Sequence, residues 1–504
     1  MKKPALTMAL LCLVFFSGLK AQPEAALSRE TVEGQLRFLA SDALQGRRTG
    51  EPGNLIAASF IAALFQTYGL EKAPGLNAYF QPIQFEQGIP PQRATLKVGA
   101  TEYVFKEDFV LMAGDPIQME KADAVFAGYG WVDPATSHDD YKGLDIKGKV
   151  VFVLSGRPDQ SDPRAGFAAM GMKQKLASER GAAALIELYR LPFPWNFFRR
   201  YVGGESLQLP KPDSDHPSSM VYGWLKEKEG APPIPEVLKG KQAKVALFSE
   251  GYQRRQVPSQ NVIGIIPGTD PVLKKEYVLL TAHYDHVGMG RLGGGATTPA
   301  DSIFNGARDN AMGTVALLAA ANVLSKERPK RSVILLAVTG EELGLLGSSY
   351  YAENPLIPLK DVIFNLNTDG AGYNDVGIIS VIGWGRTGTD DLISQAAVNE
   401  GLKPFPDPAP EQGLFDRSDN VAFAAKGVPC VTVSPGFTRF DEAINKYYHQ
   451  VTDEAESVDM EYLLKYSNVF TSIARLIANH SEKPQWKSGD KYEQAGKALY
   501  QERD

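Results

Sequence analysis

The sequence predicts an α/β protein in which a mixed, mostly parallel sheet is covered by helices. Residues 277–282 and 332–338 are short apolar runs, rich in β-branched residues and bounded by turn-forming residues, a pattern typical of buried strands. From residue 258 onward such runs alternate with stretches of helical apolar spacing, which favours a sheet enclosed between helices. Between residues 120 and 255 strand-like runs are separated by Gly and Asp turns, so we expect an inserted β-rich domain there.

Length and local composition divide the chain further. The 504 residues, 43% of them hydrophobic, suffice for two to three domains. We predict the N-terminal part of the main domain at 22–119, the insertion at 120–255, the bulk of the main domain at 256–483 and a polar tail at 484–504. Residues 192–235, rich in Pro, Gly, Trp and Ser, are interpreted as a long irregular segment that is either a lid over a cleft or a surface loop. Helical spacing occurs at 28–41, 54–70, 310–327, 343–353, 388–401, 418–426 and 460–480, and 429–433 is predicted as a strand.

The first 21 residues have the three parts of a secretory signal peptide. Lys2 and Lys3 precede an apolar run at 5–16, and small residues lead to a predicted cleavage after Ala21. The run is too short to cross a membrane, so we expect a secreted or periplasmic protein with no membrane span in the mature chain. Cleavage would remove Cys12 and leave Cys430 alone, which excludes an internal disulfide.

The charge balance excludes a polyanionic partner. The net charge is −6, and acidic and basic residues are interspersed along the chain. This distribution argues against nucleic acid and against an anionic membrane surface. The oligomeric state stays open.

Potential metal ligands follow the predicted strands of the main domain. Open α/β sheets place their ligand crevice at the carboxyl ends of the strands, so we expect these side chains to lie close together. Nitrogen and oxygen ligands with spare carboxylates are what a hydrolytic zinc centre needs. The set is His283 and Asp285 after the first run, Glu341 and Glu342 after the second, Asp369 after a third run beginning at Val362, and His449 near the end of the domain.

The spacing of the first motif suggests separate roles for its residues. His283 and Asp285 flank Tyr284 and therefore point to the same side of an extended chain. His283 can then bind a metal while Asp285 orients its ring or tunes the site. By the same alternation His286 points to the opposite side, and we assign it no metal role.

The order of the motifs along the chain is distinctive. It runs H-x-D at 283–285, D-N at 309–310, E-E at 341–342, N-x-D at 367–369 and a late His at 449. In this order the motifs resemble those of the M28 family of metallopeptidases, whose members include di-zinc aminopeptidases and their carboxypeptidase relatives. The resemblance implies a zinc-peptidase phosphorylase/hydrolase-like fold. Residues 120–255 resemble the protease-associated (PA) domain that is inserted in some of these peptidases.

The resemblance also implies a role for each motif residue. Two Zn²⁺ are expected, and Asp309 would bridge them. Glu341 would be the general base that takes a proton from a water bridging the metals and passes it to the leaving amine. A cis peptide bond between Asp309 and Asn310 is expected as well. The implied ligands are His283 and Asp369 on one metal, Glu342 and His449 on the other, and Asp309 on both.

Simpler interpretations of these residues stay open. Asp309 has the position of an N-cap for a helix that begins near Asn310. Adjacent acids at a helix start, such as Glu341 and Glu342, also stabilise the helix dipole. Asn367 offers an alternative register for the N-x-D motif, but Asp369 is preferred because a carboxylate is required. Two neighbouring positions are noted: Tyr448 as a weaker candidate for steadying an oxyanion, and Asn420, which stands where the family often has His.

These motifs favour an aminopeptidase that acts on peptide substrates. A carboxypeptidase or dipeptidase on the same scaffold would need a basic side chain for the C-terminal carboxylate. A glutaminyl cyclase relative would use one metal and normally lacks a PA insertion, and a non-catalytic PA/peptidase-like binding protein should have lost ligands. The basic candidates are Arg386, Arg417 and Arg439.

Overall fold

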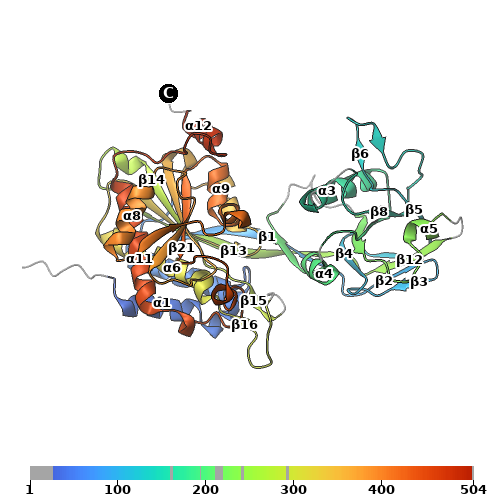
Figure 1. Cartoon of the computed structure of the whole chain (residues 1–504), viewed down its shortest axis with the longest axis horizontal. Helices are drawn as coiled ribbons and strands as arrows, with labels where there is room; N and C mark the ends of the chain where they lie inside the picture. The colour runs from blue at the N-terminus through green and yellow to red at the C-terminus, as the bar shows by residue number, and fades with distance from the viewer. Residues whose placement is uncertain are drawn as a thin grey trace, which may run out of the picture.

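The computed structural model describes residues 27–158, 163–192, 194–210, 219–239, 243–290 and 295–501. The predicted signal peptide, residues 1–21, lies outside these described residues. The chain forms two lobes, each built on its own sheet, and the strands β1 and β13 run from one lobe to the other (Figure 1).

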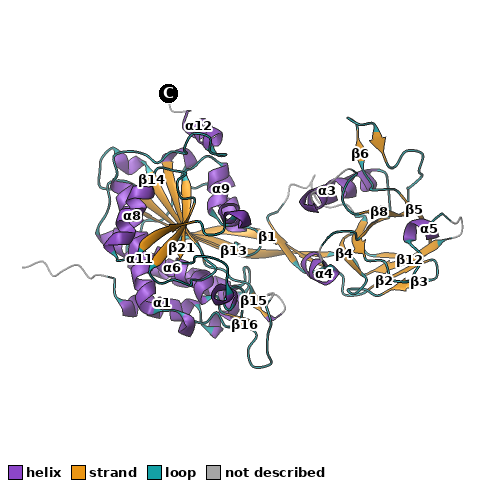
Figure 2. Ribbon diagram, viewed as in Figure 1, coloured by secondary structure: helices purple, strands orange, loops and turns teal. Residues whose placement is uncertain are grey.

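The main lobe contains a mixed nine-stranded sheet, as the sequence predicts (Figure 2). Its neighbouring strands β17, β14, β18 and β21 are parallel to one another, and antiparallel pairs flank them on both sides. The three predicted apolar runs form β17, β14 and β18. In sheet order the strands are β10 (Ser206–Gln208), β1 (Phe80–Ile89), β13 (Gln253–Ile266), β17 (Ser332–Val338), β14 (Tyr277–His283), β18 (Val362–Thr368), β21 (Cys430–Pro435), β19 (Ile378–Ile382) and β20 (Lys403–Pro406).

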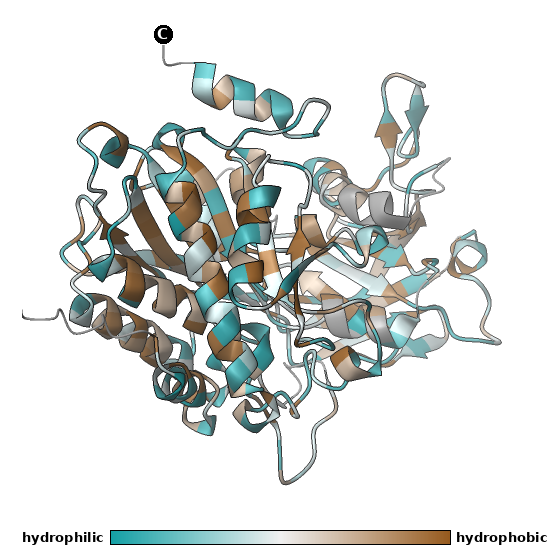
Figure 3. Cartoon of the chain, turned by 60° about the vertical axis from the view of Figure 1, so that its left-hand side comes forward, coloured by the Kyte–Doolittle hydropathy of each residue, from teal (hydrophilic) through white to brown (hydrophobic). Residues whose placement is uncertain are grey.

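Helices cover both faces of this sheet because alternate residues of its strands point to opposite cores. On β14, Val278 and Leu280 belong to the larger core, whereas Leu279 belongs to the core on the other face. Apolar strands therefore lie between helices whose outer surfaces carry hydrophilic residues (Figure 3). The larger core includes residues of α1 (Arg29–Leu39), α2 (Pro52–Thr67), α6 (Met312–Lys326), α8 (Asp390–Asn399) and α11 (Met460–Asn479), and the opposite core includes residues of α7 (Leu346–Glu353) and α9 (Asn420–Ala425).

The second lobe contains an eight-stranded sheet with its own two apolar cores. The sheet begins at Ala94, before the predicted boundary at residue 120, because the early strands β2, β3 and β4 join it. In sheet order its strands are β3 (Thr101–Tyr103), β2 (Ala94–Val98), β12 (Lys244–Ser249), β5 (Ile117–Phe126), β8 (Val150–Leu154), β9 (Ala184–Leu188), β11 (Val221–Leu225) and β4 (Phe109–Ala113), with α3 (Pro163–Glu179) and α5 (Ile234–Val237) in the same segment.

The prediction that residues 192–235 are irregular is wrong for much of their described part. This stretch contains helix α4 (Trp195–Val202), strand β10 of the main sheet and strand β11 of the second sheet. Trp224 of β11 is buried and packs against Phe198 of α4 with ring centroids 4.7 Å apart. Both aromatic side chains thus form part of the core of the second lobe.

Two short hairpins and a terminal helix complete the fold. The hairpins are β15 (Gly288–Met289) with β16 (Ile303–Phe304) and β6 (Val132–Asp133) with β7 (His138–Asp139). Helix α12 (Glu493–Gln501) lies in the predicted polar tail. None of the helices in the described part of the chain has the length and apolar character to cross a membrane.

Candidate metal centre

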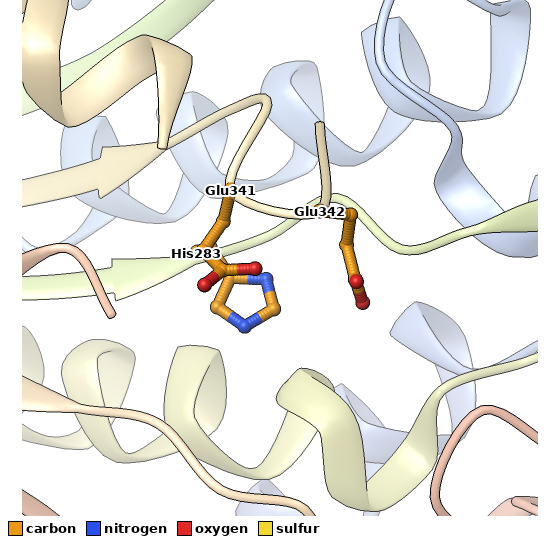
Figure 4. A group of neighbouring side chains, drawn as sticks. All are labelled: His283, Glu341 and Glu342. Atoms are coloured by element: carbon orange, nitrogen blue, oxygen red, sulfur yellow. The ribbon is translucent and has the colours of Figure 1, made fainter. Parts of the chain in front are cut away.

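Strand register explains why residues far apart in the sequence meet. His283 is the last residue of β14 and pairs with Val338 at the end of β17, so the turn carrying Glu341 and Glu342 begins beside it. On the other side of β14, Thr281 pairs with Asn367, which sets Asp369 level with His283. Figure 4 shows Glu341 and Glu342 reaching from their turn toward the space beside the His283 ring. The site therefore lies at the carboxyl ends of three neighbouring strands.

The five predicted ligands form two groups that share Asp309. In the first group, His283 Nε2 lies 3.1 Å from Asp369 Oδ1 and 3.4 Å from Asp309 Oδ1. In the second, His449 Nε2 lies 3.2 Å from Asp309 Oδ2 and 3.1 Å from Glu342 Oε2. Each carboxylate oxygen of Asp309 thus faces a different histidine. The predicted cis peptide bond between Asp309 and Asn310 is present.

These separations fit metal coordination. Two ligand atoms at zinc bond lengths from a tetrahedral centre lie about 3.3 Å apart. The four distances between histidine nitrogens and carboxylate oxygens in the two groups, 3.1–3.4 Å, lie close to that value. Imidazole nitrogen with carboxylate oxygen is also a donor set that zinc accepts.

The many buried acidic side chains of the site also favour the binding of cations. Burial would raise the pKa of Asp309, but hydrogen bonds with His283 and His449 hold it well below its ordinary value. Burial would lower the pKa of His449, whereas Glu342 and Asp309 raise it to about 11. Burial raises the pKa of Glu341 well above that of an ordinary glutamate. Negative charge of this density in a buried site is stable only when it is paired or coordinates metal.

Asp285 connects two of the loops that carry these groups. Its Oδ1 accepts a hydrogen bond from the backbone N–H of Glu341 (3.2 Å), and its Oδ2 accepts one from the Thr49 hydroxyl (3.0 Å). The nearest partner of the His283 Nδ1 is the backbone carbonyl of Asp285 at 3.2 Å, while the Asp285 carboxylate lies 3.8 Å away. The backbone rather than the carboxylate therefore contacts the imidazole, and the carboxylate fixes the Glu341 turn.

His286 does not point away from the carboxylates, contrary to the sequence prediction. Its Nδ1 lies 2.7 Å from Glu342 Oε1, and both side chains are buried. Its Nε2 is buried without a hydrogen-bond partner in the described part of the chain. Strand β14 ends at His283, so side-chain alternation does not extend to residue 286. The second histidine of the His-Tyr-Asp-His run was the available sequence signal.

The backbone around His286 depends on a glycine. Gly306 has a positive φ of 59°, and a Cβ at this position would lie 2.5 Å from the His286 ring and 2.4 Å from the Asp309 carbonyl oxygen. Only glycine combines that conformation with such close approach. Gly306 thus allows the His286 ring to pack against the segment that carries Asp309.

Two further buried side chains, Arg47 and Asp453, hold the ligand loops. The Arg47 guanidinium donates to the backbone carbonyls of Tyr284, Asn305 and Gly306, and so joins the loop after β14 to the loop before α6. Asp453 accepts from the backbone N–H groups of Arg308 and Asp309. The loop contacts just described join residues more than a hundred positions apart in the sequence, so no local pattern predicts them.

A cleft opens in front of the carboxylates. Asp309, Glu341, Glu342, Asp369 and His449 all line it. Tyr448 also lines it, beside the His449 ring. One wall is apolar and consists of Ala371, Ile382, Leu414, Phe437 and Phe440.

Comparison with known protein families finds a match within the main lobe. Residues 261–474 match peptidase family M28. Aminopeptidase YwaD of Bacillus subtilis (strain 168) is 27% identical over 230 residues, which cover 45% of this chain and 46% of YwaD. A vacuolar membrane protease of Saccharomyces cerevisiae (strain ATCC 204508 / S288c) is 32% identical over 226 residues, which cover 44% of this chain and 20% of that protein. The matches thus span less than half the length of these curated relatives.

Solved structures support the fold over nearly the whole chain. The aminopeptidase from Aneurinibacillus sp. strain AM-1 superposes with a TM-score of 0.60 at 21% identity, over 90% of this chain and 95% of that one. BSAP, a zinc aminopeptidase from Bacillus subtilis, superposes with a TM-score of 0.50 at 21% identity, over 92% of this chain and 98% of that one. The similarity therefore includes the region of the second lobe.

Proposed function

Since residues 261–474 form a domain of peptidase family M28, we propose that the chain is a secreted zinc-dependent aminopeptidase that removes N-terminal residues from peptides. The observation that carries the proposal is the position of Asp309, whose two oxygens face two separate donor groups. His283 and Asp369 would hold one zinc ion, His449 and Glu342 would hold a second, and Asp309 would contribute an oxygen to each. Relatives named as an aminopeptidase and as a zinc aminopeptidase support this activity, and the predicted signal peptide supports secretion.

Zinc in this donor set supplies Lewis acidity that polarises a carbonyl group and lowers the pKa of water. Glu341 is the cleft carboxylate that the ligand assignment leaves free, and we assign it the role of general base. It takes a proton from the attacking water and passes it to the leaving amine. A carboxylate in this position can accept a proton and release it again, as a general base must.

Asp285 affects this proton transfer by holding Glu341 in place. Its hydrogen bond to the Glu341 backbone fixes the turn on which the base stands. We assign the Tyr448 hydroxyl the role of stabilising the oxyanion that forms on the carbonyl. Burial raises the pKa of Tyr448, so the phenol keeps its proton and donates a hydrogen bond.

The apolar wall of the cleft defines where the N-terminal side chain lies. Ile382, Phe437 and Phe440 offer an apolar surface next to Asp369, so the residue to be removed packs there while its carbonyl faces the donor groups. The acids that line the cleft attract the substrate's amino group. Together these contacts orient the N-terminal peptide bond toward Glu341.

The test compares free and N-acetylated peptides as substrates of the purified protein, with and without a chelator and alongside Glu341→Gln. We expect cleavage only of peptides with a free N-terminus, loss of cleavage on chelation, and recovery when zinc is added back. Glu341→Gln should bind zinc as the wild type does and lose about 100-fold to 10,000-fold in kcat. Release of C-terminal residues from N-acetylated peptides would instead assign a carboxypeptidase. Absence of turnover by the zinc-loaded protein would leave only a binding role.

A further inference from the structure

Arg417 lies in the cleft and belongs to none of the roles assigned above. It ends the short helix η8 (Leu414–Arg417) and lines the cleft together with Leu414 and Ser418. The Ser418 hydroxyl is buried and accepts a hydrogen bond from Asn367 Nδ2 (2.8 Å), which anchors this segment to β18. Arg417 therefore has a fixed attachment point at the edge of the cleft.

The Arg417 guanidinium has no carboxylate partner in the described part of the chain. The sequence suggested two other arginines as carboxylate receptors, Arg386 and Arg439. Each of these is paired with an aspartate. Arg386 makes two hydrogen bonds to Asp490, at 2.6 and 2.9 Å. Arg439 lies 3.5 Å from Asp441 and is largely exposed.

The acid next to Arg417 in the sequence is engaged elsewhere. Asp416 accepts hydrogen bonds from the Lys491 ammonium and from the Tyr492 hydroxyl, at 2.9 Å for the latter. Both partners lie in the C-terminal segment before α12. Asp416 is thus held by other partners, and no carboxylate among the described residues pairs with the donors of Arg417.

The surroundings of Arg417 define what it would bind. The cleft offers an apolar wall that includes Ile382 and Phe437, four acids, and one guanidinium among the described lining residues. A guanidinium recognises carboxylates by parallel hydrogen bonds in a planar arrangement. We propose that Arg417 binds a carboxylate of the peptide substrate and thereby determines the specificity of the cleft. This inference rests on the proposed peptidase function.

Two carboxylates of a peptide could meet this requirement. One is the side chain of an N-terminal Glu or Asp, whose methylene groups would lie against the apolar wall. The other is the C-terminal carboxylate of a dipeptide, which would make the enzyme prefer very short substrates. The chemistry at Arg417 is the same in both cases, so the substrates of the test must separate them.

The test uses substrate pairs that differ only in the carboxylate. Glutamyl and glutaminyl p-nitroanilides probe the side chain, and Leu-Gly and Leu-Gly-amide probe the C-terminus. For the wild type we expect kcat/KM to favour the carboxylate member of at least one pair by about tenfold, the scale of a partly exposed charged hydrogen bond. Arg417→Gln should abolish that preference, and Arg417→Lys should retain part of it. Since each ratio is taken within one variant, a general loss of activity cancels.

Controls separate this inference from the proposed function. Arg439→Gln removes an exposed guanidinium and should keep the wild-type ratios. Leucine p-nitroanilide reports the basal peptidase activity, so its failure as a wild-type substrate would count against the proposed function itself. If it is cleaved while Arg417→Gln leaves both ratios unchanged, the Arg417 proposal is overturned. The proposal also fails if Arg439→Gln and Arg417→Gln change the ratios equally.

Discussion

The two hydrogen bonds of the Asp285 carboxylate predict that variants lose activity in proportion to the bonds they remove. Asp285 is completely buried and holds the Glu341 backbone through Oδ1 and the Thr49 hydroxyl through Oδ2. Asp285→Asn keeps an oxygen for the Glu341 N–H and turns its amide N–H₂ toward Thr49. Both bonds then change from charge-assisted to neutral, which costs about 1 kcal/mol each, or about 30-fold in kcat/KM for the two.

Removal of the whole group should cost more. Asp285→Ala leaves the Glu341 N–H and the Thr49 hydroxyl without their partner in a buried site, a loss of about 4 kcal/mol or roughly a thousandfold. Thr49→Val removes only the outer bond and should cost about tenfold. The expected order of kcat/KM is therefore wild type, Thr49→Val, Asp285→Asn and Asp285→Ala, from highest to lowest.

The assay is hydrolysis of leucine p-nitroanilide, with the zinc content of each variant measured in parallel. Thr67→Val is the matched control, since Thr67 is exposed and its hydroxyl contacts only a carbonyl of its own helix. A fully zinc-loaded Asp285→Ala with at least a third of wild-type kcat/KM would refute the reasoning. Equal losses in Asp285→Asn and Asp285→Ala would refute the role given to the hydrogen-bond geometry.

Three further predictions concern zinc affinity, stability and pH. His286→Ala removes the contact that orients Glu342 and should weaken zinc binding about 10-fold to 100-fold in competition with a chelator; an unchanged zinc affinity would contradict this. In the second lobe, Lys173→Met leaves Glu187 buried without its 2.8 Å partner and should lower the free energy of unfolding in urea by about 3–5 kcal/mol, whereas the double variant Lys173→Met/Glu187→Leu should recover most of it. Burial and the nearby Asp42 and Asp301 raise the pKa of Glu454 to about 7, above about 4.3 in the unfolded chain. The folded state thus binds this proton more tightly, and the resulting stability is lost as the pH rises through 7. Glu454→Gln should therefore raise Tm at pH 8 but not at pH 4, while the exposed control Glu442→Gln should change it at neither.

Local patterns in the sequence were sufficient for the centre of the main sheet. The runs that became β14, β17 and β18 are short and mostly apolar, as expected for strands buried on both faces, although β18 also buries Asn365 and Asn367. The proposed ligands lie at or just beyond the ends of these strands: His283 is the last residue of β14, and Glu342 and Asp369 follow β17 and β18. The ordered motifs then supplied Asp309 and His449, which lie on loops without a periodic signal.

Long-range pairing limited the prediction of the second lobe. Strand β2 pairs with β12 and strand β4 pairs with β11, and both partners come more than a hundred residues later in the sequence. The composition of residues 94–113 resembles that of the main domain, so it does not indicate that these strands belong to the second sheet. In the same way β11 lies within a Pro- and Gly-rich stretch, and its burial between β9 and β4 outweighs the local turn signals.

Three buried side chains share a physical role, since each joins one ligand loop to another through hydrogen bonds. Arg47 joins the loop after β14 to the loop before α6, and Asp285 joins the loop after β14 to the turn after β17. Asp453 joins the loop before α6 to the segment that follows His449. Burial lowers the pKa of Arg47, but only to about 10, so it stays charged at neutral pH beneath the acids of the site. These links hold the donor atoms at metal-binding distances through the protein's own hydrogen bonds, which is the arrangement that a preorganised hydrolytic centre requires.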